Sequence, residues 1–208
     1  DIEVKYVVAN DDVASAPKAV KEQRHGIAGG FFMWKVGGAR AAKGGSLDDV
    51  IASAQNVVNR TKSICVGLEP CVIPALGHSN FKIEDGTMEF GVGHHGEAGT
   101  KVEKLKSASE MAQEMAETIL NDFDFEEGKE VAVMLSSLGA TPVMELYVLY
   151  DEVEKVLAKA GHKVWKTYIG NYVTSLDMNG ASLTIVDLDD EIKELLSEPA
   201  VPIGMKNY

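Results

Sequence analysis

The sequence predicts an α/β fold in which helices pack against a mixed sheet. Short apolar runs of strand length alternate with segments of helical periodicity along most of the chain. Residues 131–135 are continuously apolar, as in a strand that is covered on both faces. Residues 163–173 and 182–188 have the pattern of two strands joined by a tight turn, and such a hairpin would place antiparallel strands in the sheet.

The predicted elements follow one another in a regular order. The predicted strands are residues 2–9, 62–69, 87–92, 131–135, 163–173 and 182–188. The predicted helices are residues 27–43, 46–60, 108–119, 142–160 and 189–197. Residues 70–86 are expected to form a long loop because prolines and glycines interrupt them, and residues 101–106 are expected to be a charged, solvated stretch.

The first half of the chain contains one ambiguous helix and one clear helix. Residues 27–43 combine large apolar side chains with glycines, and the glycine pair at 37–38 lowers the helix propensity. Residues 46–60 have Ser46 as an N-cap, acidic residues in the first turn and apolar residues along one face. The Asn-Asp-Asp cluster at 10–12 favours a turn and a cap, with an acidic site as the alternative.

The second half of the chain contains clearer helix boundaries. Ser107 and Glu110 form a capping box in front of a stripe of alanine and methionine, which predicts a helix that faces the core. Thr141 followed by Pro142 is typical of a helix N-terminus, and Gly161 is typical of a helix C-terminus.

Length, composition and charge limit the function. A chain of 208 residues fits one large domain or one domain with part of another, and 45% hydrophobic residues can form a buried core. The formal net charge of −12 argues against nucleic acid and anionic membranes as partners. No apolar run has the roughly 18 residues that a membrane span needs, and no signal peptide is visible. Cys65 and Cys71 are expected to be buried free thiols in a reducing, cytoplasmic environment.

The stretch from Met88 to Thr100, MEFGVGHHGEAGT, concentrates glycines and ionisable side chains. Little side-chain bulk surrounds His94 and His95, so an imidazole there could meet a small molecule closely. Neutral imidazole is a nucleophile that can add to a ketone carbon and form a hemiaminal, whereas a plain polyol has no electrophilic carbon. A structural, hydrogen-bonded histidine is the alternative interpretation of His95.

His94 by itself is expected to be incidental. A metal site formed by His94, His95 and His78 is a weaker hypothesis, because adjacent histidines point in different directions and the third ligand is far upstream.

Residues 89–99, EFGVGHHGEAG, resemble the E-x-G-x-G-x-H-G-E-P-G signature of the substrate-binding subunit of dihydroxyacetone (glycerone) kinases. Four further blocks agree with that family in the same order, namely residues 7–14, 67–77, 136–147 and 174–186. Several ordered blocks over nearly the whole chain are much more specific than any single motif.

The resemblance implies a domain division and a chemistry. Residues 1–62 would be the C-terminal part of a first α/β domain, and residues 63–208 would be the second α/β domain of a two-domain subunit. His95 would hold dihydroxyacetone covalently as a hemiaminal, with Gly96 and Glu97 also in the substrate-binding loop. This chain would bind no cofactor, because ATP or ADP with Mg²⁺ would lie on a partner nucleotide-binding subunit. The subunit would form a homodimer.

The chain also departs from the family pattern. Ala98 replaces the usual proline, and Thr100 and Lys101 replace residues that are more usually apolar and acidic. An upstream half of the subunit, with a histidine and an aspartate that act as acid and base on the substrate hydroxyls, has no match here. A non-catalytic homologue that senses dihydroxyacetone and regulates transcription through a partner protein is therefore the alternative to a kinase. A plain α/β interaction domain is a third possibility.

Overall fold

The computed structural model describes residues 2–79, 81–94, 97–124, 128–202 and 205. The helices are η1 (Lys18–Gln23, a 3₁₀ helix), α1 (Gly30–Ala42), α2 (Leu47–Asn59), α3 (Ala108–Asp122), α4 (Val143–Lys159) and α5 (Asp190–Ser197). The strands are β1 (Thr61–Glu69), β2 (Thr87–Phe90), β3 (Lys101–Lys104), β4 (Glu130–Ser137), β5 (Lys163–Gly170) and β6 (Asn179–Asp187).

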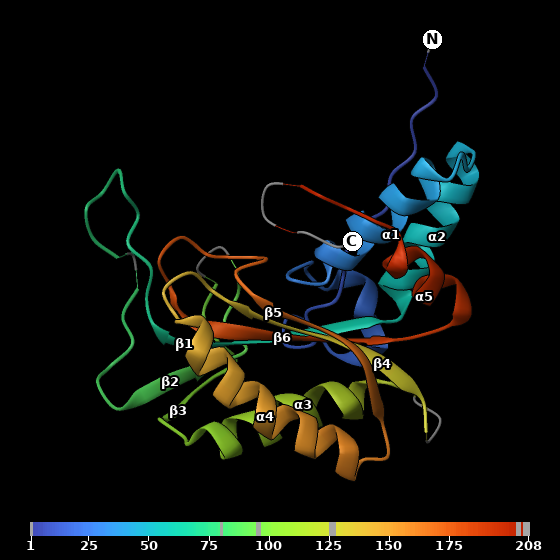
Figure 1. Ribbon diagram of the computed structural model, residues 1–208. Helices are drawn as coiled ribbons and strands as arrows, with labels where there is room; N and C mark the ends of the chain where they lie inside the picture. The colour runs from blue at the N-terminus through green and yellow to red at the C-terminus, as the bar shows by residue number, and fades with distance from the viewer. Residues whose placement is uncertain (1, 80, 95–96, 125–127, 203–204, 206–208) are drawn as a thin grey trace.

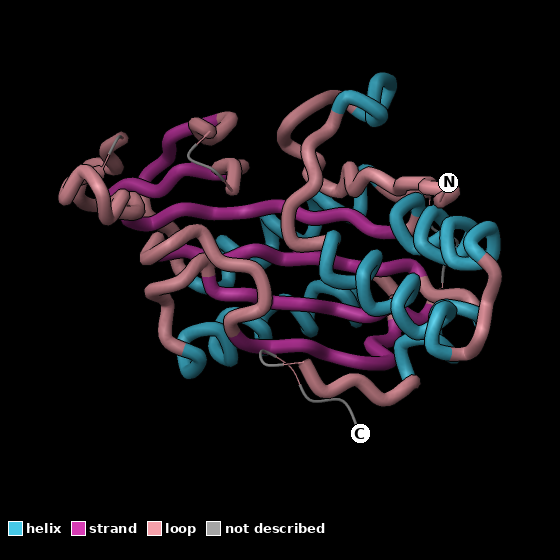
Figure 2. Tube along the Cα trace, turned by 90° about the horizontal axis from the view of Figure 1, so that it is seen from above, coloured by secondary structure: helices cyan, strands magenta, loops and turns pink. Residues whose placement is uncertain are grey.

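Within the described residues, one mixed sheet of six strands organises the fold (Figures 1 and 2). The strand order is β3-β2-β1-β6-β4-β5. β4 and β5 are parallel, and the other neighbouring strands are antiparallel. The predicted α/β class with a mixed sheet is confirmed.

Helices cover both faces of the sheet (Figure 1). On one face α3 and α4 pack over the strands, and Met115 and Leu183 have no exposed surface there. On the other face α1, α2 and α5 pack over side chains such as Phe32 and Val186. The central strands are buried from both sides, which explains the continuous apolar run at 131–135. The helices in the described part of the chain lack the length and apolar character that a bilayer crossing needs.

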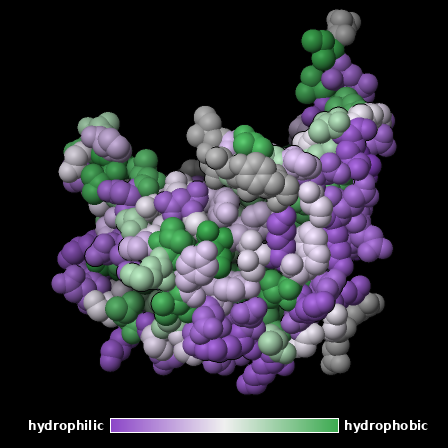
Figure 3. Space-filling model, in the orientation of Figure 1, coloured by the Kyte–Doolittle hydropathy of each residue, from purple (hydrophilic) through white to green (hydrophobic). Residues whose placement is uncertain are grey.

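The first predicted strand is wrong. Residues 2–9 are extended but unpaired within the described structure, and Ile2, Val4, Tyr6 and Val8 are 90, 80, 83 and 65% exposed. Figures 1 and 3 show this segment projecting from the body, with apolar side chains in green along it. Alternating apolar residues favour an extended backbone, but a strand also needs a free edge with which to form hydrogen bonds.

The predicted hairpin of residues 163–188 is also wrong, because β4 lies between β5 and β6. β4, α4 and β5 form a parallel crossover unit that places β5 beside β4. β6 takes the other edge of β4, with Leu135 opposite Leu183. Residues 171–178 therefore connect two strands that are not neighbours.

Residues 101–104 form the edge strand β3, although the sequence predicts a solvated stretch there. Three of its four side chains are charged. It therefore lacks the alternation of apolar and polar residues from which a strand is predicted.

Helix caps explain where α2, α3 and α4 begin. The predicted caps at Ser46 and at Ser107 with Glu110 are confirmed, and both helices begin with complete capping boxes. Thr141 is not the N-cap of α4, because Pro142 occupies that position. The hydroxyl of Thr141 instead donates a 2.7 Å hydrogen bond to the carbonyl oxygen of Gly180.

Leu183→Ala in β6 is expected to lower the free energy of unfolding by about 2–5 kcal/mol, because Leu183 is fully buried on a central strand. Tyr6→Ser is expected to change that free energy by less than about 0.5 kcal/mol, because Tyr6 is outside the sheet and exposed. Urea denaturation followed by circular dichroism measures both variants. Equal losses would mean that residues 2–9 belong to the cooperatively folded structure.

Candidate functional site

The candidate site lies where one edge of β1 changes its partner. The first part of this edge pairs with residues 11–13, since the Ser63 amide donates to the Asp11 carbonyl (2.7 Å) and the Val13 amide donates to the Ser63 carbonyl (3.0 Å). Further along, β1 pairs with β2. The edge of β1 therefore passes from residues 11–13 to β2 between Ser63 and Val66.

The turn on one side of this junction is stabilised by two buried aspartates. The carboxylate of Asp11 accepts hydrogen bonds from the amides of Ile27 (3.1 Å) and Gly29 (2.7 Å). The carboxylate of Asp12 accepts from the amide of Ala14 (3.0 Å). The prediction that these short acidic side chains form a turn is confirmed, because both carboxylates bind backbone amides.

Burial disfavours the charge on both aspartates. Desolvation raises the pKa of Asp11, although its hydrogen bonds oppose the shift. Desolvation raises the pKa of Asp12 to about 6, and the nearby Asp11 adds to the shift.

The histidine loop, residues 91–100, forms the other side of the junction. Its first amide, that of Gly91, donates to the carbonyl of Cys65 in β1 (2.8 Å). Near its end, the amide of Thr100 donates to the carbonyl of Phe90 (2.8 Å), so the loop closes on the end of β2. These bonds fix both ends of the loop relative to the central sheet.

Glycine is required at the start of the loop. Gly91 has φ +72°, and a Cβ on it would lie 2.7 Å from the Cβ of Ala14 and 2.9 Å from the Oγ1 of Thr100. A Cβ on Gly93 would overlap the carboxylate of Glu97. The glycines therefore allow the loop to approach the turn and to fold back on itself.

Glu89 is a supporting residue to which the sequence analysis assigns no role. It is 8% exposed on β2, and its Oε2 accepts a hydrogen bond from the amide of Gly99 (2.9 Å). Its position as the first residue of the matched signature is the signal by which it could have been found. Its carboxylate therefore holds the end of the loop against β2.

The predicted site residues are only partly within the described structure. His94 is half-buried at the bend of the loop, and Glu97 is exposed with its carbonyl 2.9 Å from the amide of Gly93. His95 and Gly96 lie outside the described residues. Among the described residues no group of three or more metal-ligating side chains is assembled, and His78 is exposed with Nδ1 2.9 Å from the carbonyl oxygen of Ser79.

The two cysteines, which are predicted to be buried free thiols, also lie near this junction. Cys65 and Cys71 are free and buried, as expected, in one apolar cluster with Val92 of the loop. Burial raises the pKa of the Cys65 thiol, so this cysteine is a core residue and not a nucleophile at neutral pH.

Comparisons of the sequence and of the structure with known proteins agree on one family. The model of the family described as "Dak1 domain" matches residues 1–203. The dihydroxyacetone-binding subunit DhaK of the PTS-dependent dihydroxyacetone kinase 1 of Listeria innocua is 39% identical over 191 residues, which are 92% of this chain and 58% of the relative. The D-erythrulose kinase of Mycolicibacterium smegmatis is 36% identical over 199 residues, which are 96% of this chain and 34% of the relative.

A solved structure agrees with these sequences. The structure named as a dihydroxyacetone kinase operon co-activator matches with a TM-score of 0.88 and 29% identity, over 95% of this chain and 62% of that chain. This chain therefore spans less than two thirds of the length of each of these relatives.

Gly91→Ala is expected to destabilise the protein by about 1–3 kcal/mol, because it combines an unfavourable positive φ with a close contact to Ala14. Gly86→Ala is the matched control, since Gly86 has φ +74° and open space around its Cβ position, so only the backbone strain remains. Ala14→Gly in the Gly91→Ala background should recover part of the loss. Urea denaturation measures all three variants, and equal losses at Gly91 and Gly86 would exclude a tight contact between turn and loop.

The buried carboxyl of Asp12 predicts a pH dependence. Its folded pKa of about 6 lies above the ordinary value of 3.8, so stability is fully present below about pH 4 and is lost as the pH rises through 6. The shift corresponds to about 3 kcal/mol. Asp12→Asn, which keeps the hydrogen bond from Ala14, should remove this dependence, as measured by urea denaturation between pH 4 and 7. A constant difference between parent and variant over this range would contradict the assignment.

Proposed function

We propose that this chain, which belongs to the Dak1 domain family, is the ketone-binding part of a dihydroxyacetone kinase. The observation that supports this most strongly is the histidine loop, whose Glu89 to Gly99 signature is built as a tight loop at the edge of β1. The kinase relatives named above for dihydroxyacetone and erythrulose suggest a short ketose as the substrate class.

The proposed binding step is covalent. A ring nitrogen of His95 adds to the carbonyl carbon of the ketose, the π electrons of the C=O bond move to the oxygen, and the ring N–H proton neutralises that oxygen. The product is a neutral hemiaminal in which one N–C bond has formed and no group has left. Gly96 and Glu97 belong to the same substrate-binding loop. A polyol of the same size forms no such adduct, so the site selects its ligand by reactivity as well as by shape.

Phosphoryl transfer requires protein components in addition to this chain. We propose that a partner nucleotide-binding subunit with ATP or ADP and Mg²⁺ supplies the phosphoryl group, and that an upstream half of the subunit supplies the acid and base for the substrate hydroxyl. The division at residues 1–62 and 63–208 and the homodimer stay predictions. Within this scheme the chain holds and orients the ketose, and proximity is its contribution to the rate.

A non-catalytic ketone sensor is the second candidate. The match to the operon co-activator, with a TM-score of 0.88, favours it, because the same fold then serves regulation. Both candidates would bind the ketone at the same loop. They differ in whether the bound ketone is phosphorylated when the partner subunit and a nucleotide are present.

The test is a carbon-13 NMR titration with carbonyl-labelled dihydroxyacetone, with labelled erythrulose as a second ketose. We expect the ketone signal to convert to a hemiaminal signal with the parent and to remain unchanged with His95→Ala. His78→Ala, which removes an exposed histidine elsewhere, should behave as the parent. Conversion that persists in His95→Ala but is lost in His94→Ala would move the tether to the neighbouring histidine, and the absence of any adduct would exclude covalent binding by this chain.

A further inference from the structure

A short edge strand determines where the second end of the histidine loop lies. β3 begins at Lys101, directly after the loop. It has four residues and lies at the edge of the described sheet, where β2 is its neighbour, and Val102 is 65% exposed. Its backbone pairs with β2, but a strand this short with an exposed apolar side chain buries little surface. Side-chain contacts to the rest of the fold therefore add to what holds β3 in place.

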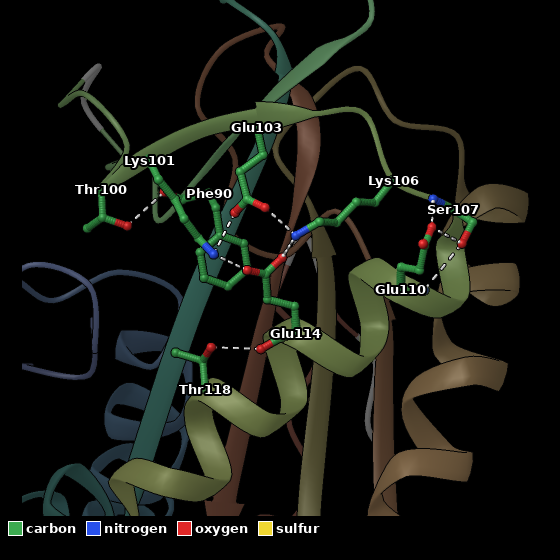
Figure 4. A network of polar contacts seen from close by, with 9 residues as sticks. All are labelled: Phe90, Thr100, Lys101, Glu103, Lys106, Ser107, Glu110, Glu114 and Thr118. Carbon is green, nitrogen blue, oxygen red and sulfur yellow. Dashed lines mark hydrogen bonds and ion pairs between the residues drawn. The ribbon is translucent and has the colours of Figure 1, made fainter.

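Four side chains of alternating charge form a closed ring between β3 and α3 (Figure 4). The Nζ of Lys101 lies 2.6 Å from the Oε1 of Glu103 and also contacts Glu114. The Nζ of Lys106 lies 2.5 Å from the Oε2 of Glu114 and also contacts Glu103. Each charge in this ring, which we call the charge ring, has two neighbours of opposite sign.

The helix side of the charge ring is firmly fixed. Glu114 lies on α3 between Met111 and Met115, which are buried in the core under the sheet. Figure 4 also shows the capping box of Ser107 and Glu110, which fixes the first turn of α3. The charge ring thus connects the edge strand β3 to a helix that the core holds in place.

The charge ring is partly shielded from water. The side chains of Glu103 and Glu114 are 19% and 18% exposed. Hydrogen bonds from Lys101 and then Lys106 lower the pKa of Glu103 to about 2, so this carboxylate stays ionised at neutral pH. The Nζ of Lys101 also lies 4.9 Å above the ring of Phe90. Partly shielded charges in a network stabilise a structure more than isolated surface pairs do.

We propose that the charge ring is a positioning device for the histidine loop, with Lys101 and Glu114 as positioning residues. Lys101 is covalently next to Thr100, so holding its side chain against α3 fixes the end of the loop at which Glu89 binds Gly99. The consequence for ketone affinity rests on the proposed function, whereas the effect on the loop does not.

The charge ring depends on the positive charge of residue 101. An acidic side chain at 101 would face Glu103 and Glu114 and would repel both, so the charge ring could not form.

Amide hydrogen exchange by NMR on the whole chain tests the proposal without a ligand. In Lys101→Met and in Glu114→Gln, the amides of Gly93 and Gly99 should exchange about tenfold faster than in the parent, because the loop opens more often. Glu117→Gln removes the same charge from an exposed position of α3 and is the matched control. The melting temperature should stay near that of the parent in all three, and exchange at the parent rate in both ring variants would overturn the proposal.

Rescue separates positioning from a general loss of structure. Lys101→Arg, which keeps the positive charge, should restore slow exchange at Gly93 and Gly99. Inversion of all four charges (Lys101→Glu, Glu103→Lys, Lys106→Glu and Glu114→Lys) restores the alternation and should also protect these amides. Fast exchange in both rescue variants would overturn the proposal.

The ketone titration supplies the functional readout. Lys101→Met should weaken dihydroxyacetone binding severalfold at low salt, because the end of the loop is no longer held against α3. If the parent itself forms no adduct, the proposed function fails while the exchange experiment still decides the role of the charge ring. Equal affinity of parent and Lys101→Met at low salt would show that the charge ring does not position the loop for binding.

Discussion

The hydrogen bonding of β1 is the constraint on which the site depends. β1 is buried over most of its length, so its backbone amides and carbonyls need partners inside the protein. β6 supplies partners along one edge without interruption for most of the strand. The other edge is divided between residues 11–13 and β2, and the amide of Gly91 completes it at Cys65. The start of the histidine loop is therefore set by the same requirement that stabilises the core.

The two ends of the loop are held by different forces. At the start, a buried backbone hydrogen bond and a glycine in close contact with Ala14 leave little freedom. At the end, the Glu89 carboxylate and the charge ring hold a strand that contributes little to the core. A covalent adduct needs the nucleophile within a few tenths of an ångström of a productive position, so a loop fixed at both ends suits the proposed tether.

Membership of the Dak1 domain family places this architecture among proteins with more than one role. A relative named as a kinase subunit, a relative named as a kinase and a solved structure named as an operon co-activator each match more than nine tenths of this chain. A ketone-binding loop is useful to both roles, because catalysis and sensing begin with the same selective capture. In the proposed scheme, the groups that separate the two roles would act on the substrate hydroxyls, whereas the tether acts on the carbonyl carbon. The loop of this chain is therefore consistent with either role.

The sequence by itself determined the helices and strands that depend on interactions between residues close together in the chain. The caps at Ser46 and Ser107 and the apolar run at 131–135 predict α2, α3 and β4 correctly, because propensity, capping and periodicity depend on near neighbours. The ordered signature also predicted the family and the loop. Only the tertiary structure decided the strand order, the unpaired state of residues 2–9 and the existence of β3. Strand pairing depends on which edges are free after distant segments have packed, and the charge ring joins residues that only folding brings together.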